Sequence, residues 1–144
     1  MASALASSHN PASDQTRNWF IGCAMLVITL LRSAAVITTP LELGVDEAQY
    51  WLWSQELDFG YFTKPPLIAW IIGITHWIFG HHTWAVRLPA CWIHLITALL
   101  LWRGASWLFG QQAGRLAALI WISLPATGLG SLLISTDTPL LALW

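Results

Sequence analysis

Charged residues are scarce in this chain, and their scarcity excludes most classes of soluble protein. Asp, Glu, Lys and Arg together make up 9% of the 144 residues, whereas hydrophobic residues make up 56%. An ordinary soluble domain carries roughly one quarter charged residues, so the composition indicates an integral membrane protein. The six basic residues are offset by seven acidic ones, and without a basic surface nucleic acid is excluded as a partner.

Cysteine is also rare, whereas tryptophan is abundant. Cys23 and Cys91 both lie inside apolar runs, where a cysteine behaves as a small buried hydrophobe and not as part of a disulfide or a metal pair. Eleven tryptophans are present, and Trp19, Trp84 and Trp102 stand where apolar runs begin or end. Tryptophan at such positions is typical of the aromatic belts at the two membrane surfaces.

Long apolar runs predict where the chain crosses the membrane. As helices at ~1.5 Å per residue, residues 19–39, 84–102 and 116–134 each match a hydrocarbon core of ~30 Å. A further apolar run starts near residue 138. The sequence therefore predicts an all-α integral membrane protein with three spanning helices, the start of a fourth, and no soluble domain.

Residues 1–18 are small and polar, and we expect them to form a disordered cytoplasmic tail. A cleaved signal peptide is the alternative interpretation. It is disfavoured because Arg32 interrupts the apolar core and because the run continues past the small residues that would form a cleavage site. We expect Arg32 itself to anchor the first span by extending its side chain to the membrane surface.

Residues 40–83 are predicted to form an outer loop that carries two juxtamembrane helices. In residues 46–57, Tyr50 and Leu57 share one helical face with aromatic residues between them, which predicts an amphipathic helix. Residues 66–79 are apolar but would be only about 21 Å long as a helix. That length is short for a crossing and typical of a helix lying in the membrane interface.

The distribution of charge supports this arrangement. Residues 103–115, between the last two predicted spans, contain two arginines and no acid, and such loops usually lie in the cytoplasm. If residues 66–79 crossed the membrane, that loop would lie outside. With residues 66–79 in the interface, the same chain order places Asp46, Glu47 and Asp137 together on the outer face.

These acidic residues are the candidates for chemistry. Such carboxylates can act as a general base and can hold a divalent metal cation, for which Asp46 and Asp137 are the expected ligands. A plainer interpretation stays open for each residue. Acids commonly begin helices, where Asp46 and Glu47 would face the positive end of the helix dipole and Asp137 would cap a helix.

Two basic residues are candidates for contacting a phosphate. Lys64 lies close to the acidic cluster, and a lone ammonium there suits a phosphate or pyrophosphate ligand. Its alternatives are anchoring at the membrane surface or an ion pair with Asp58. Arg87 begins a span on the same side and is the second candidate, with interfacial anchoring as the alternative.

The chain resembles the N-terminal part of bacterial family 39 type glycosyltransferases in four ordered segments, DEAQYWLWSQELDFGYFTKPPLIAW, WAVRLP, LFGQQAGRLAAL and STDTPLL. These GT-C membrane enzymes include protein O-mannosyltransferases and the aminoarabinose transferases of lipid A. The resemblance implies inverting transfer of a sugar from a polyprenyl-phosphate donor. The acceptor would be a glycan, lipid or protein at the outer face of the bacterial inner membrane.

The resemblance also implies roles for single residues. Asp46 would be the catalytic base, Glu47 would support it, Asp137 would lie near the donor phosphate or a metal, and Lys64 matches the basic residue before the double proline. Relatives of this type continue through many more spans, so we expect an N-terminal fragment that lacks much of the active cavity. Two other hypotheses stay open: an inactive membrane subunit or assembly factor that binds a lipid phosphate or a partner protein, and a fragment of a transporter. The position of the acids at a membrane face argues against the transporter.

Overall fold

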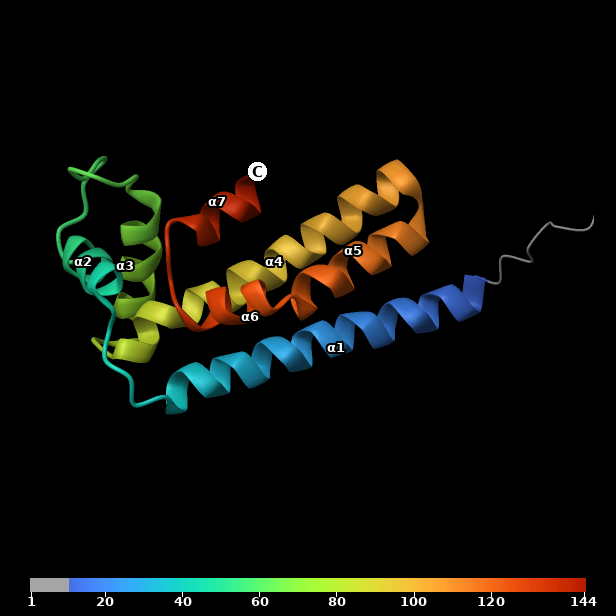
Figure 1. Cartoon of the computed structure of the whole chain (residues 1–144), viewed down its shortest axis with the longest axis horizontal. Helices are drawn as coiled ribbons and strands as arrows, with labels where there is room; N and C mark the ends of the chain where they lie inside the picture. The colour runs from blue at the N-terminus through green and yellow to red at the C-terminus, as the bar shows by residue number, and fades with distance from the viewer. Residues whose placement is uncertain (1–10) are drawn as a thin grey trace, which may run out of the picture.

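The structure, a computed structural model, describes residues 11–144, and in this range it consists of α-helices without a strand (Figure 1). The helices are α1 (Pro11–Thr38), α2 (Val45–Trp53), α3 (Leu67–Phe79), α4 (Thr83–Phe109), α5 (Gln111–Ser123), α6 (Pro125–Leu132) and α7 (Asp137–Leu143). The predicted all-α membrane class is confirmed.

Two of these helices, α1 and α4, are long and apolar enough to cross a membrane, and α5 with α6 would make a third span that is bent by 55°. Figure 1 shows α1 and α4 side by side along the long axis, with α5 doubling back along α4. Four buried side chains fill the space where α1, α4 and α5 meet: Met25, Ala98, Ala118 and Ile122.

The span predicted for residues 116–134 is divided at Leu124 into the two helices α5 and α6. Leu124 has an extended conformation, with φ −59° and ψ 132°, because the ring of the following Pro125 disfavours the helical region for the residue before it. The last carbonyls of α5 then lack helical partners. Arg32 donates from Nη2 to the carbonyl oxygen of Ile122 at 2.7 Å and from Nη1 to Ser131 Oγ at 3.2 Å. Arg32 therefore bonds α1 to the bend, a contact that the predicted anchoring role did not include.

Helix α1 begins eight residues earlier than the first span was predicted to begin. Residues 11–18, predicted as part of a disordered tail, are helical. Asp14 explains the difference, because its Oδ1 accepts from Arg17 Nη2 at 2.6 Å and from Arg115 Nη2 at 2.7 Å. The contact with Arg115 joins α1 to α5 and cannot be read from local composition. The prediction for residues 1–10 lies outside the described residues.

Helices α4 and α5 pack closely along the stretch that was predicted to be a loop, residues 103–115. The connection is Gly110 alone, with φ +90°, a conformation that favours glycine. At Gly114 an added Cβ would lie 2.5 Å from the backbone oxygen of Trp102 and still closer to Ser106 Oγ. The close approach of the two helices therefore depends on the absence of a side chain at Gly114.

Substitution of this glycine gives a first testable expectation. Gly114→Ala should destabilise the protein by about 1–3 kcal/mol, because overpacking at a rigid contact forces the helices apart. The matched control is Gly104→Ala, where an added Cβ would meet nothing within 4 Å and alanine favours the helix. Thermal unfolding of the purified protein in detergent measures both. Equal midpoints for the two variants would contradict the packing described for Gly114.

Helices α2 and α3 lie at one end of the long helices and not alongside them (Figure 1). Tyr50 of α2 is buried in a second core with Ile68, Ile72, Val86, Ala90 and Ile134. Helix α2 ends at Trp53, four residues before its predicted end, and Leu57 is exposed. Of the predicted apolar face, Tyr50 is buried within the protein and Leu57 lies beyond the end of α2. The link between α6 and α7 reaches the same end of the molecule.

Candidate functional site

The candidate site is built where α2, the first turns of α4 and the α6–α7 link meet. Glu47 and Arg87 form a bidentate ion pair there, with Arg87 Nε 2.9 Å from Glu47 Oε1 and Arg87 Nη2 2.7 Å from Glu47 Oε2. Both residues are buried, each about 4% exposed. Bidentate arginine–carboxylate pairs are strong and fix orientation, so this pair sets the position of α2 on α4.

The remaining hydrogen-bond acceptor positions of the Glu47 carboxylate are also occupied by donors of the protein itself. Its Oε2 accepts from the backbone N–H of Gly44 at 2.9 Å, which closes a capping box, and its Oε1 accepts from the N–H of Ile134 at 3.1 Å. A carboxylate has about four acceptor positions, and four donors surround this one. Burial tends to raise the pKa of Glu47, but the hydrogen bonds from Arg87, Gly44 and Ile134 lower it below its ordinary value overall. Glu47 is therefore held as a carboxylate with no free position for a substrate proton.

Arg87 is equally committed to protein atoms. Its Nη1 donates to the carbonyl oxygen of Leu41 at 3.1 Å and its Nη2 to that of Glu42 at 2.8 Å. With the two bonds to Glu47, four bonds use a group that has five N–H donors. The guanidinium thus fastens the chain before α2, and little of it is left for the predicted phosphate contact.

Asp46 is placed differently from its neighbour. It is exposed in the first turn of α2, and its side chain makes no hydrogen bond or ion pair with the described residues. Successive residues of an α-helix project about 100° apart, so the inward anchoring of Glu47 turns Asp46 outward. The structure therefore separates the two acids into one buried carboxylate that holds the fold and one exposed carboxylate without a side-chain partner among the described residues.

Asp137 and Lys64 complete the set of predicted site residues. Asp137 is exposed at the start of α7, where Thr136 and not Asp137 is the N-cap residue. It follows Ile134, whose N–H Glu47 accepts, so the same carboxylate that orients Asp46 also holds the link leading to Asp137. Lys64 is half-buried. Within the part of the chain that the structure describes it forms no ion pair with Asp58.

A metal site is not formed by these residues alone. Among residues 11–144 there is no group of three or more His, Cys, Asp or Glu side chains placed to hold a metal ion. Asp46 and Asp137 are two carboxylates, fewer than the six or more oxygen ligands that a hard divalent cation takes. The use of a divalent cation by this pair stays a prediction.

One feature of the site that the sequence did not indicate is an aromatic pair behind α2. The rings of Trp53 and Tyr61 are stacked with centroids 4.8 Å apart. The Tyr61 hydroxyl donates toward the carbonyl oxygens of Trp53 and Glu56, each at 2.9 Å. These contacts fold the segment after α2 back onto the helix beside a hollow of about 600 Å³. Tyr61 had no signal in the sequence beyond its place between Gly60 and the double proline.

The geometry defines a helical membrane protein with an accessible carboxylate fixed at one end of its spanning helices. Comparison with known proteins names the family. Residues 63–144 match the model of the dolichyl-phosphate-mannose-protein mannosyltransferase family. The chain belongs to this family, which confirms the resemblance noted from the sequence. No solved structure matches the chain.

The relatives are sugar transferases from bacteria. Lipid A galacturonosyltransferase RgtD of Rhizobium johnstonii is 38% identical over 118 residues, covering 81% of this chain and 25% of the relative. Undecaprenyl phosphate-alpha-4-amino-4-deoxy-L-arabinose arabinosyl transferase 1 of Sodalis glossinidius is 36% identical over 97 residues, covering 65% of this chain and 17% of the relative. The chain thus spans a quarter or less of the length of these relatives.

Proposed function

We propose that this protein takes part in transferring a sugar from a polyprenyl-phosphate-linked donor to a glycan, lipid or protein acceptor at the outer face of the bacterial inner membrane. The observation that carries the proposal is that, in a chain of this family, Asp46 is exposed whereas the adjacent Glu47 is buried and paired with Arg87. A transferase of this kind needs one accessible base at the membrane surface, held in a fixed orientation. Asp46 has that exposure, and the Glu47–Arg87 pair supplies the orientation.

The chemistry assigns one role to each residue. Asp46 takes the proton from the hydroxyl or amine of the acceptor molecule while the oxygen or nitrogen of that group attacks the anomeric carbon of the donor. The bond from the anomeric carbon to the phosphate oxygen breaks, and polyprenyl phosphate leaves with the electron pair. Lys64 would stabilise the charge on the departing phosphate, and Asp137 would lie near the same group. Inversion follows from direct attack on the face opposite the phosphate.

The test of this proposal is a transfer assay with the complete protein in proteoliposomes that contain a polyprenyl-phosphate sugar. Release of polyprenyl phosphate that depends on the protein and on an added acceptor is the expected result. If the protein binds the donor but releases no polyprenyl phosphate, the proposal is wrong and the inactive membrane subunit is favoured instead.

A separate expectation concerns topology, with the N-terminus in the cytoplasm. In Figure 1, α2, α3 and the α6–α7 link gather at one end, and the start of α1 and the α4–α5 turn gather at the other. In a background without Cys23 and Cys91, the variants Asp58→Cys and Asp137→Cys should both react with an impermeant maleimide from outside the cell. The variant Gln111→Cys should react only after the membrane is opened. Reaction of positions 58 and 137 from opposite sides would show that α3 crosses the membrane.

A further inference from the structure

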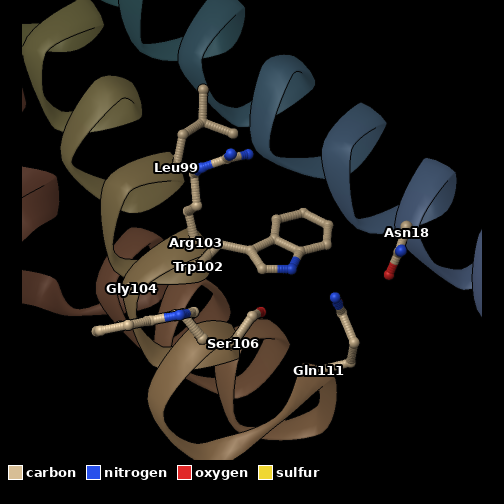
Figure 2. A pocket seen from close by; sticks show the side chains of 8 residues that line it. Asn18, Leu99, Trp102, Arg103, Gly104, Ser106 and Gln111 are labelled. Carbon is tan, nitrogen blue, oxygen red and sulfur yellow. The ribbon is translucent and has the colours of Figure 1, made fainter.

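The end of the bundle opposite the candidate site carries a hollow of about 810 Å³ between α1 and the α4–α5 hairpin (Figure 2). Its lining combines indole rings, amides, a hydroxyl and a guanidinium, from Asn18, Trp102, Arg103, Ser106, Trp107 and Gln111. Figure 2 shows the Trp102 ring and the Gln111 side chain directed into the space in front of Asn18. This space adjoins the ends of two helices that are long enough to cross a membrane, so a ligand held there would be at the level of the lipid headgroups.

The charge of this end is positive, because Arg17, Arg103 and Arg115 outnumber Asp14. Asp14 pairs with both Arg17 and Arg115, and Arg115 Nε also donates to Asn18 Oδ1 at 2.8 Å. Arg103 is exposed and has no ion pair or hydrogen bond from its side chain within residues 11–144. No acidic residue lines the hollow. An anion is therefore the complementary ligand, and a group that also carries an ammonium would find no acid to pair with it.

A second, smaller hollow lies against α1 next to the first. It measures about 330 Å³ and shares Asn18 with the larger hollow. After Asn18 in the sequence its lining is apolar and consists of Trp19, Gly22, Cys23 and Leu26. At Gly22 an added Cβ would meet nothing within 4 Å, so the groove is open along the helix surface. A cationic, amide-lined cavity that adjoins an apolar groove at Asn18 matches the headgroup and the acyl chain of a lipid.

We propose that this end of the protein binds one anionic phospholipid, with its phosphodiester at Arg103, its headgroup among the indoles and amides, and an acyl chain along α1 below Asn18. Binding at these residues does not depend on the proposed transfer reaction. Only the leaflet rests on the proposed function, which places this end at the cytoplasmic surface.

The experiment uses the complete protein in nanodiscs of phosphatidylcholine with a minor fraction of a photoreactive phosphatidylglycerol, followed by mapping of the crosslinked peptides. Crosslinks are expected on the part of α1 that follows Asn18 and around Trp107. Unlabelled phosphatidylglycerol should compete for the site and reduce these crosslinks. Arg103→Gln should weaken that competition roughly fivefold, the effect of one basic residue at an anionic lipid. The matched control is Arg17→Gln, which removes an arginine at the same end but outside both hollows and should change the competition little.

Arg103→Lys keeps the charge and should keep most of the preference, which separates loss of the cation from loss of folding. Equal competition by phosphatidylcholine and phosphatidylglycerol, or equal effects of the substitutions at Arg103 and Arg17, would overturn the proposal. The absence of any lipid crosslink at these hollows would also overturn it and would indicate that protein covers them. Sugar transfer by the same samples is scored separately, so failure of lipid binding is distinguishable from failure of the proposed function.

Discussion

Arg87→Met is expected to leave little folded protein in the membrane. The substitution removes the partner of Glu47 and leaves a buried carboxylate facing an apolar side chain, and it also frees the carbonyl oxygens of Leu41 and Glu42. Breaking one side of a buried pair costs about 3–5 kcal/mol. That is a large part of the ~5–15 kcal/mol by which folded proteins are stable, so most of the protein should unfold or be degraded.

The amount of monodisperse protein after detergent extraction, together with its thermal midpoint, measures this effect. Glu42→Gln is the matched control, because it changes a neighbouring exposed acid while keeping the backbone carbonyl that Arg87 uses. It should shift stability by no more than about 0.5 kcal/mol. The double variant Glu47→Gln with Arg87→Met should be more stable than the sum of the two single losses predicts, since neither charge is then left alone. Normal accumulation and an unchanged midpoint for Arg87→Met would contradict the role assigned to the pair.

Asp46→Asn is expected to have the opposite profile, with normal accumulation and almost no transfer. The exposed side chain of Asp46 makes no bond in the described structure, so its removal should cost the fold little. Asparagine keeps the size of the side chain but cannot act as a base toward the hydroxyl or amine of the sugar acceptor. General base catalysis typically contributes 10²- to 10⁴-fold, and a rate loss of about that size is predicted.

A matched control for this substitution lies in the same segment, between α1 and α4. Asp58 is exposed, and its Oδ1 accepts from the N–H of Phe59 at 2.6 Å, a bond that an asparagine oxygen can also accept. Asp58→Asn should therefore transfer sugar at close to the wild-type rate. Each variant removes one negative charge from the segment between α1 and α4, and the two differ only in the carboxylate that is lost.

The architecture could be predicted from the sequence wherever it depends on local hydrophobicity. Two long apolar runs became α1 and α4, and the short run 66–79 became α3. The bend between α5 and α6 could not be predicted with the same assurance, because proline is tolerated in membrane helices whose freed carbonyls find other partners. Here the partner is Arg32, which lies 90 residues before Ile122 in the chain.

The residues of the candidate site could be predicted from the sequence, but the separate roles of Asp46 and Glu47 could not. Adjacent acids at a membrane face indicated chemistry at Asp46 and Glu47, and spacing alone could not say which of them is free. That distinction depends on Arg87, which is 40 residues away from Glu47 in the sequence, and on the backbone of Ile134, which is 87 residues away. Tertiary contacts over such separations leave no local pattern.

An exposed carboxylate at Asp46, oriented by the buried Glu47–Arg87 pair, is proposed as the base in sugar transfer from a polyprenyl phosphate. The most direct measurement is the rate of acceptor-dependent release of polyprenyl phosphate by wild-type protein, Asp46→Asn and Asp58→Asn at equal amounts of folded protein. A loss of about 10²- to 10⁴-fold is expected for Asp46→Asn alone. Sugar transfer by Asp46→Asn at the same rate as by Asp58→Asn would contradict the proposed role of Asp46 as the base.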